Sequence, residues 1–427
     1  TNLSVSSTKS MTGHCLGAAG AIEAAITVKA MSENIAPPTI GYDEEDLARL
    51  KEKAGDLDFI ANKAEEKNLE TVMSNSFAFG GTNASIIFSK KEHKAKEGRK
   101  EPVYITGLGA VMSADNGENS RSVTLDSGAF AARDVKLGFY RKLDRFSQMQ
   151  LLSGIDALKD AGITVDADNE KLIGGIVGTA NGPMAEITSF QKTVCEKGPT
   201  AGSAFSFPNT VYNAAGGHLS IFTKTKGYCA TVANGSQAGI QSIAYAYDVL
   251  QKGDEQVMMA CGTDENSAEI DKLFRAAGAG EGYVLGEGSS ALVLETKSFA
   301  DGRNVHKYAE VAGCALAHSA ECSAEALDRA IENALAKAGA SAAEIKAVYG
   351  FANGTSLDEM QKNAVSRYFA GAAVVDVRAE TGDCRAASDN YAALMAAKAI
   401  DGGEYENAIV LGADRSGSFS AAVLKRV

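Results

Sequence analysis

The sequence lacks three features that would place it in other classes of protein. No apolar run approaches the roughly 18 residues that a membrane-spanning helix needs, and the first thirty residues lack the basic-then-apolar layout of a secretory signal. Prolines number six in 427 residues and no low-complexity tract occurs, which leaves little room for disorder. We therefore expect a folded, cytoplasmic protein with no membrane partner.

Metal-ligand spacing and a disulfide framework are absent as well. The seven cysteines and five histidines are scattered along the chain, as in proteins of a reducing compartment. Acidic side chains outnumber basic ones, 54 to 42, which gives a net charge of −12. This negative charge argues against nucleic acid as the main partner. No glycine-rich stretch has the spacing of a nucleotide-binding loop. We predict no metal site and no permanently bound cofactor.

One break in composition divides the chain. Residues 90–101, KKEHKAKEGRKE, contain no large apolar side chain, and we predict that they form a charged linker between a short unit, 1–89, and a long unit, 102–427. In the long unit, apolar strand-like stretches alternate with helical ones, which indicates an α/β fold whose sheet is covered on both faces. The predicted helices are 144–161, a stretch after residue 236, and 323–339, and the predicted strands are 103–107, 172–179, 256–262, 291–295 and 347–353.

An internal repeat adds a second level of organisation. MTGHCLGAAGAIEAAITVKAM, residues 11–31, aligns without gaps on ETGDCRAASDNYAALMAAKAI, residues 380–400, at a constant offset of 369 residues. A long segment precedes the second copy, whereas nothing comparable precedes the first. We therefore expect residues 1–89 to be the tail of a domain whose earlier part lies elsewhere.

Three stretches contain residues suited to chemistry. His14 and Lys9 stand before a helix whose first residues are nearly all glycine and alanine, where both could meet a developing oxyanion, although a structural histidine on a tightly packed helix fits as well. Phe79 stands between an alanine and two glycines, as in a loop that can change conformation or in an ordinary turn between strands. Ser236 occupies a strand-turn-helix junction that suits a nucleophile or a packed turn.

In these stretches the sequence resembles the β-ketoacyl synthases of fatty acid and type II polyketide biosynthesis, which belong to the thiolase superfamily. VSSTKSMTGHCLGAAGAIEA and SNSFAFGGTNASIIF are similar to the end of such a synthase, while VYITGLGAV, FPNTVYNAAGGHLSI, GYVLGEGSSALVLE and GFANGTS follow the family's order from its beginning. The resemblance implies a thiolase-like α/β fold, with duplicated βαβαβ layers and helices between and outside two mixed sheets. It also implies that the phosphopantetheine arm of an acyl carrier protein carries the substrates.

The short unit keeps the residues that the resemblance makes catalytic. His14 matches the second of the family's two catalytic histidines, Lys9 matches its lysine, and Glu23 matches an acidic residue of the lysine-centred network. Phe79, followed by Gly80 and Gly81, matches the aromatic gate beside the nucleophile. Ala78 replaces a usual glycine before this gate, and its Cβ restricts the backbone there.

The long unit departs from the family's catalytic pattern at every essential position. Ser236 stands where the nucleophilic cysteine belongs, or Gln237 does if the alignment slips by one residue. Asn353 replaces the first histidine, Asp383 the second, and Arg378 the lysine. A serine without a neighbouring base is a weak nucleophile, and an aspartate repels an oxyanion. The resemblance therefore implies a non-catalytic partner similar to a chain-length factor.

Together these observations predict a component of a type II ketosynthase/chain-length-factor complex. The complex would catalyse decarboxylative Claisen condensation of acyl and malonyl groups on acyl carrier protein across a heterodimer-like interface. The nucleophilic cysteine and the first histidine would come from the N-terminal portion of the ketosynthase, on a separate chain or an upstream segment. A non-catalytic scaffold or regulatory ketosynthase homologue, and a condensing component of fatty-acid elongation, remain the alternatives.

Overall fold

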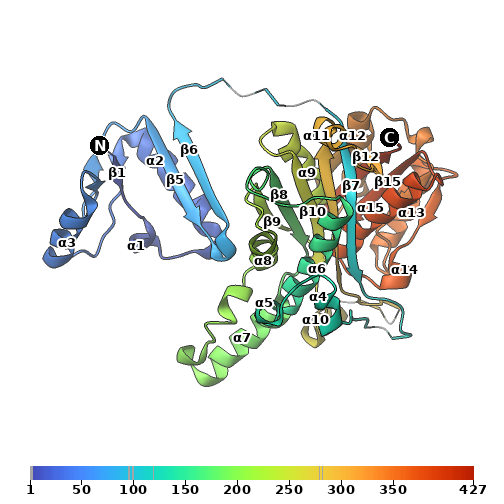
Figure 1. The fold of residues 1–427 in the computed structure, drawn as a ribbon, viewed down its shortest axis with the longest axis horizontal. Coiled ribbons are helices and arrows are strands. Elements are labelled where there is room, and N and C mark those ends of the chain that lie inside the picture. Colours follow the sequence, from blue (N-terminus) through green and yellow to red (C-terminus); the bar gives the residue numbers. More distant parts are fainter. Residues whose placement is uncertain (1–2, 95–96, 99–100, 119, 278, 281) are drawn as a thin grey trace. The chain divides into compact units, whose positions relative to one another are not determined.

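The chain forms two compact units. The computed structural model describes residues 3–94, 97–98, 101–118, 120–277, 279–280 and 282–427. Unit 1 comprises Thr1–Lys96 and unit 2 comprises Glu97–Val427, so the division falls within the charged segment 90–101 (Figure 1).

Unit 1 consists of helices followed by an antiparallel hairpin. Its helices are α1 (Lys9–Thr12), a 3₁₀ turn (Leu16–Ala18), α2 (Ala19–Glu33) and α3 (Glu44–Ala54). Its strands are β1 (Ser4–Val5), β2 (Ile35–Ala36), β3 (Asp58–Phe59), β4 (Glu65–Glu66), β5 (Thr71–Phe77) and β6 (Asn83–Ser89). Strands β5 and β6 pair in register from Thr71 opposite Ser89 to Phe77 opposite Asn83, and a second 3₁₀ turn (Phe79–Gly81) joins them.

Unit 2 is built on a mixed sheet of ten strands. The strands of its first half are β7 (Val103–Met112), β8 (Ile173–Thr179), β9 (Cys229–Ala233), β10 (Val257–Asp264) and β11 (Gly288–Thr296). Those of its second half are β12 (Ala309–His318), β13 (Ala347–Tyr349), β14 (Ala373–Val375), β15 (Asn407–Ala413) and β16 (Ser418–Lys425). Four of the five predicted strands are confirmed as β7, β8, β10 and β11. The fifth, 347–353, is shorter than predicted, because β13 ends at Tyr349.

The helices of unit 2 lie between these strands in the chain. They are α4 (Ser127–Ala131), α5 (Leu137–Tyr140), α6 (Arg145–Asp160), α7 (Met184–Lys197), α8 (Ala214–Thr223), α9 (Ala238–Lys252), α10 (Ala268–Ala276), α11 (Lys297–Arg303), α12 (Ala324–Ala338), α13 (Leu357–Tyr368), α14 (Arg378–Thr381) and α15 (Ala386–Asp401). Short 3₁₀ turns cover Pro199–Ala201, Phe207–Asn209 and Ala342–Glu344. The predicted helices are confirmed as α6, α9 and α12.

The order of the strands shows that the fold is duplicated. The first half has the order β7-β11-β10-β8-β9, and the second repeats it as β12-β16-β15-β13-β14, with the same parallel and antiparallel pairs. Two residue pairs, Ala309 with Ile105 and Glu310 with Tyr104, join β12 to β7. The two predicted mixed sheets are thus the halves of one continuous sheet, and the thiolase-like α/β class is confirmed.

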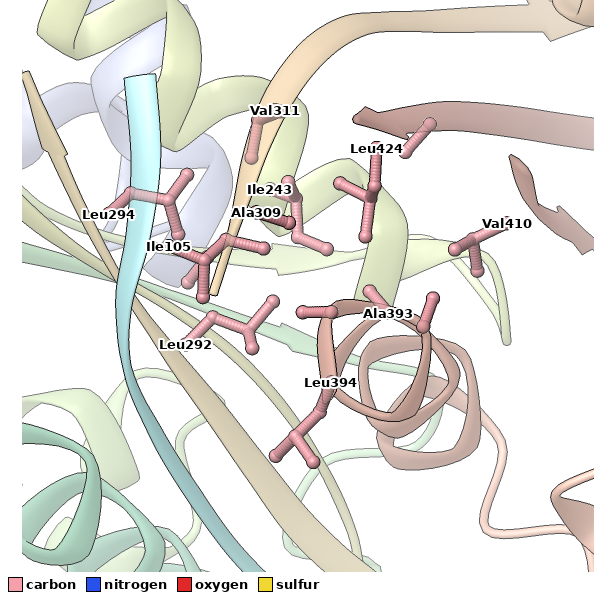
Figure 2. Close-up of a cluster of buried hydrophobic side chains, with 14 of the residues drawn as sticks. Ile105, Ile243, Leu292, Leu294, Ala309, Val311, Ala393, Leu394, Val410 and Leu424 are labelled. Atoms are coloured by element: carbon pink, nitrogen blue, oxygen red, sulfur yellow. The ribbon is translucent and has the colours of Figure 1, made fainter. Parts of the chain in front are cut away.

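A buried layer of helix separates the two halves of the sheet from each other. Ile243 of α9 and Leu394 of α15 belong to one apolar cluster with Leu292 of β11 and Leu424 of β16 (Figure 2). Separate clusters fill the outer faces, one with α6 and α8 and one with α12 and α13. Helices therefore lie between and outside the halves, and this arrangement brings the first turns of α9 and α15 together.

The contact between α9 and α15 is close enough to require glycine. A Cβ on Gly239, in the first turn of α9, would lie 2.0 Å from the carbonyl oxygen of Ala386, the first residue of α15. Backbone approach of this kind is possible only without a side chain. The starts of α9 and α15, which follow Ser236 and Asp383 in the chain, are therefore fixed against each other.

The internal repeat is reproduced in backbone conformation. Gly13 has φ 74° and ψ 176°, and Gly382, which lies 369 residues later, has φ 73° and ψ 177°. Leu16 and Arg385, the next such pair, both adopt a positive φ, at 49° and 56°. Non-glycine residues seldom adopt this conformation, so its recurrence at both positions shows that the two segments fold alike.

Candidate active site and its degenerate copy

Lys9 and Glu23 join the first two helices of unit 1. Lys9 opens α1, and Glu23 lies in the second turn of α2. The ammonium group of Lys9 forms an ion pair with Oε1 of Glu23, and 35% of the lysine side chain stays exposed against 14% of the glutamate. The pair therefore fixes the ammonium group near the start of α2 while leaving it accessible.

The backbone orients His14, which lies in the turn between α1 and α2. The amide of Leu16 donates a hydrogen bond to Nδ1 of His14 at 3.1 Å. Because Nδ1 accepts, the proton of a neutral imidazole lies on Nε2. His14 is exposed in unit 1. Its Nε2–H group can therefore donate to an oxygen on which negative charge develops.

Phe79, Gly80 and Gly81 form the 3₁₀ turn between β5 and β6. The Ala78 amide closes the turn by donating to the Thr82 carbonyl at 2.9 Å, and Gly81 has a φ of 82°. Ala78 itself is extended, with φ −112° and ψ 162°. An alanine adopts this conformation freely, so the Cβ that replaces the usual hydrogen introduces no strain in this state of the loop.

The β5–β6 hairpin of unit 1 leaves large apolar side chains uncovered. Phe77 is 76% exposed, Ile87 61% and Met73 54%. In unit 2, the corresponding strands β15 and β16 are buried over nearly their whole length, because β13 and β12 pair with their outer edges and α9, α12 and α15 cover their faces. The two hairpins thus share a fold and differ in what covers them.

In unit 2, the position that corresponds to His14 is the centre of a buried hydrogen-bond network. Asp383 accepts hydrogen bonds from Asn353 Nδ2 at 2.7 Å, the Tyr283 hydroxyl at 2.9 Å, the Arg385 amide at 2.9 Å and Arg378 Nε at 3.2 Å. The structure thus brings Asn353, Asp383 and Arg378 together. Every donor points at the Asp383 carboxylate, so these groups are engaged with one another.

The positive charges of neighbouring arginines keep the Asp383 carboxylate, at the centre of this network, ionised. Burial alone would raise the pKa of Asp383, but the guanidinium groups of Arg378 and Arg385 and the donated hydrogen bonds outweigh burial and hold the pKa below its usual value. Arg378 also pairs with Asp389 and donates to the Gly350 carbonyl at 2.9 Å. Asp389 has the opposite shift, because burial raises its pKa to about 7.

The early end of β13 has a local cause. Oε1 of Gln361, in α13, accepts hydrogen bonds from the amides of Phe351 and Ala352, the second at 2.7 Å. The Asn353 amide then donates to Oδ1 of Asp358 at 2.9 Å. Side chains of α13 therefore accept the hydrogen bonds that these amides would donate to a neighbouring strand if β13 were longer. The chain then turns, and Asn353 reaches Asp383.

The structure places Ser236 and Gln237 immediately before α9. The Ser236 amide donates to Oδ2 of Asp414 at 3.1 Å, and Gln237 is the N-cap residue of α9. A carboxylate beside this helix start disfavours the negative charge that an oxyanion or alkoxide would develop there. The surroundings of Ser236 therefore do not activate a nucleophile, whichever of the two residues aligns with the family's cysteine.

Sequence reasoning missed a group of buried acids beside α7. Glu265 follows β10 and accepts a hydrogen bond from the Ala185 amide, in the first turn of α7, at 2.7 Å. Burial, aided by the nearby carboxylates of Asp144 and Glu287, raises the pKa of Glu265 to about 8. Burial likewise raises the pKa of Asp144 to about 6. The one sequence signal is TDE, an acidic pair at the end of an otherwise apolar strand.

Glu265 is expected to make unit 2 less stable as the pH rises from about 7 to about 9. A carboxyl group whose pKa is raised on folding stabilises the fold while it is protonated, and this stability is lost as the pH rises through the folded pKa of about 8. The free energy of unfolding should fall by about 1.4 kcal/mol over this interval. Urea unfolding followed by circular dichroism measures it. Glu265→Gln should make the free energy of unfolding less dependent on pH, whereas Glu196→Gln, on the exposed side of α7, should leave its pH dependence unchanged. If the free energy of unfolding changed equally with pH in the two variants, Glu265 would not be the group responsible.

Among the residues that the structure describes, no helix is both long and apolar enough to cross a membrane. Within the same residues, no group of three or more histidine, cysteine, aspartate or glutamate side chains could hold a metal ion.

Comparisons with protein families match both units. Residues 1–43 match the model of the C-terminal domain of β-ketoacyl synthases, and residues 131–300 match that of their N-terminal domain. The 3-oxoacyl-[acyl-carrier-protein] synthase 2 of Coxiella burnetii is 54% identical over 88 residues, which are 21% of this chain and 20% of that protein. The chain thus spans about a fifth of that relative.

Solved structures share the fold of the chain at low sequence identity. The PfaC keto synthase-chain length factor matches with a TM-score of 0.74 at 18% identity, over 99% of this chain and 54% of that one. A chain of the structure AntDE:AntF, which is described as a type II polyketide synthase acyl carrier protein in complex with its ketosynthase, matches with a TM-score of 0.66 at 17% identity. The match covers 77% of this chain and 100% of the chain in that structure. The chain thus shares the fold of these ketosynthases. Residues 1–43 and 131–300 are thus similar to the two domains of β-ketoacyl synthases.

Proposed function

We propose that this chain is a component of a type II ketosynthase/chain-length-factor assembly that condenses acyl and malonyl groups carried on acyl carrier protein. The contrast between the two copies of one turn carries the proposal. In unit 1 this turn keeps an accessible His14 and a paired Lys9, whereas in unit 2 the corresponding Asp383 and Arg378 are buried and bonded to each other. Unit 2 is then a non-catalytic partner that helps to shape the pocket for the growing chain. The seven free cysteines support a cytoplasmic setting.

His14 and Lys9 would act on the malonyl thioester. Nε2 of His14 donates to the thioester carbonyl oxygen, and the electron pair of the breaking carbon–carbon bond becomes an enolate as carbon dioxide leaves. The enolate carbon attacks the acyl thioester on a cysteine, a new carbon–carbon bond forms and the cysteine thiolate departs, which yields a 3-oxoacyl group on the carrier. Lys9, held by Glu23, adds positive charge beside the start of α2.

The nucleophilic cysteine would come from a ketosynthase N-terminal domain that packs on unit 1. The uncovered β5–β6 hairpin supports this partner, since the same hairpin in unit 2 is enclosed by elements of both halves of the fold. Burying Phe77, Ile87 and Met73 would remove several hundred square ångströms of apolar surface from water, at about 25 cal/mol per Å². This gain would favour the packing of such a domain on unit 1.

Unit 2 also offers an edge for a heterodimer-like interface. Strand β9 ends the ten-stranded order and pairs on one side with β8. Exposed apolar side chains lie near it in the chain, at Ile221 in α8 and Tyr228 just before the strand. A strand at the end of a sheet, flanked by apolar side chains, is suited to pairing with another sheet. We propose that this edge contacts the ketosynthase partner.

Reconstitution tests the proposal. The chain is purified together with the protein that carries the ketosynthase N-terminal domain, and acyl-carrier and malonyl-carrier proteins are added. We expect 3-oxoacyl-carrier protein by intact-mass spectrometry, with carbon dioxide released in equal amount. Absence of condensation in the complete assembly would leave the scaffold alternative. Products limited to single elongations of fatty-acyl substrates would favour a fatty-acid condensing component. The similarity of the chain, over 88 residues, to a 3-oxoacyl-[acyl-carrier-protein] synthase supports this alternative.

A further inference from the structure

In unit 1, the turn that carries His14 lacks backbone hydrogen bonds that its copy in unit 2 makes. The Asp383 amide donates to the Val284 carbonyl at 2.8 Å, and the Asp383 carbonyl accepts from the Gly286 amide at 3.1 Å. These bonds accompany a short parallel bridge between Leu285 and Asp383. At the corresponding His14, neither the amide nor the carbonyl has a hydrogen-bond partner among the residues that the structure describes. Since the two turns share their backbone conformation, the turn of His14 can pair with an extended segment in the same way.

The side chains of the two turns differ in burial. In unit 2, Cys384 and Arg385 are fully buried, and the Cys384 thiol donates to the Glu287 carbonyl at 3.3 Å. In unit 1, the corresponding Cys15 is partly exposed and Leu16 is 66% exposed. Leu16 thus presents a large apolar side chain to solvent beside the histidine that the proposed reaction uses. The two copies therefore differ in what covers them and not in their own conformation.

The segment that covers the turn in unit 2 needs a glycine at the contact. A Cβ on Gly286 would lie 2.3 Å from the Thr381 carbonyl oxygen and 2.7 Å from Sγ of Cys384. Only a residue without a side chain approaches a turn this closely. Gly286 is already bonded to Asp383, so it does not serve the second turn. The segment that fits beside His14 is therefore extended, with a glycine at the contact, and it is a different copy from that of unit 2.

We infer that an extended, glycine-containing segment of the ketosynthase partner docks on the turn of His14 and completes it. The segment accepts a hydrogen bond from the His14 amide, donates one to the His14 carbonyl and covers Cys15 and Leu16, which is a form of main-chain recognition. Within unit 1 the imidazole is held by the Leu16 amide, and the two added bonds fix the backbone from which it projects. The segment is thus a positioning element for His14. The inference rests on the proposed function for the identity of the partner, whereas unit 1's own residues define the docking turn.

Cys15→Phe tests the contact. Cys384, the corresponding residue, lies so close to Gly286 that an aromatic ring at this position would occupy the space of the segment. Sedimentation measures the affinity of the full chain for the protein that carries the ketosynthase N-terminal domain. We expect this affinity to fall about tenfold or more in Cys15→Phe and to stay nearly unchanged in Cys15→Ala. Ala48→Phe, at an exposed position of α3, adds the same ring elsewhere in unit 1 and is the matched control. Circular dichroism checks that each variant is folded.

Two measurements on the unsubstituted chain follow the turn without any change of sequence. In the complex, hydrogen–deuterium exchange of the His14 amide and alkylation of the Cys15 thiol by iodoacetamide should both slow by about tenfold or more. Unchanged exchange and alkylation in the complex would overturn the inference, as would failure of the two proteins to associate. Protection that grows with the concentration of the chain alone would assign the turn to a second copy of this chain, and this result would also overturn it.

Failure of this docking site and failure of the proposed function are distinguishable. If the complete assembly forms 3-oxoacyl-carrier protein while the turn stays unprotected, the proposed reaction is supported and the docking site is wrong. If the turn is protected in the complex and no condensation occurs, the docking site is supported and the proposed reaction is wrong.

Discussion

Arg378→Met is expected to lower the free energy of unfolding of unit 2 by about 3–5 kcal/mol, the usual cost of removing one partner from a buried ion pair. Arg378 is 6% exposed, and it is the cation between Asp383 and Asp389. Methionine fills similar volume but leaves both carboxylates in the interior without that charge. Urea unfolding followed by tyrosine fluorescence measures the loss, because Tyr42 is the single tyrosine of residues 1–96 and the other tyrosines report on unit 2.

Two controls distinguish loss of charge balance from loss of packing. The triple variant Arg378→Met, Asp383→Asn, Asp389→Asn removes all three charges together and should regain most of the lost stability, since neutral residues of similar size replace buried ion pairs at little cost. Arg426→Met breaks the exposed pair with Glu406 and should cost no more than about 1 kcal/mol. Equal losses in Arg378→Met and Arg426→Met would contradict a charge-balancing role for the buried network.

The network also shows why part of the degenerate site could be predicted from the sequence. Arg378 and Asp383 lie five residues apart in one copy of a repeat, so the alignment alone places them where Lys9 and His14 stand in the other copy. The repeat predicts the turn as well, and Gly13 and Gly382 adopt backbone angles that agree within one degree. Such features follow from local sequence, because a short segment determines its own backbone conformation when glycine positions are fixed.

Contacts between distant segments could not be predicted in this way. Tyr283 and Asn353 reach Asp383 from 100 and 30 residues away, and Arg385 is buried although nothing in its neighbourhood distinguishes it from a surface arginine. The early end of β13 also results from a contact with a later segment, because Gln361 of α13 accepts hydrogen bonds from the amides that follow the strand. Alternation of apolar residues describes which face of an element is buried, but it does not describe which side chains meet across the core.

His14 is where we expect the largest effect on the reaction. Nδ1 of its imidazole accepts from the Leu16 amide, and the role that we propose for Nε2 is a hydrogen bond that strengthens as the enolate oxygen becomes negative. A donor of this kind contributes to the transition state more than to substrate binding. Removing it should therefore change kcat and leave KM nearly unaltered.

In the complete assembly, His14→Ala is expected to lower kcat for condensation by about two to three orders of magnitude, the usual effect of losing one donor to an oxyanion. Release of carbon dioxide from malonyl-carrier protein, followed together with formation of the 3-oxoacyl product, measures the change. His306→Ala, an exposed histidine of unit 2 paired with Asp401, is the matched control and should react normally. Asp383→Ala, at the corresponding position of the repeat, should lower the stability of unit 2 but leave kcat of the folded protein within a small factor. If Asp383→Ala abolished condensation in folded protein while His14→Ala did not, the roles assigned to the two copies would be reversed.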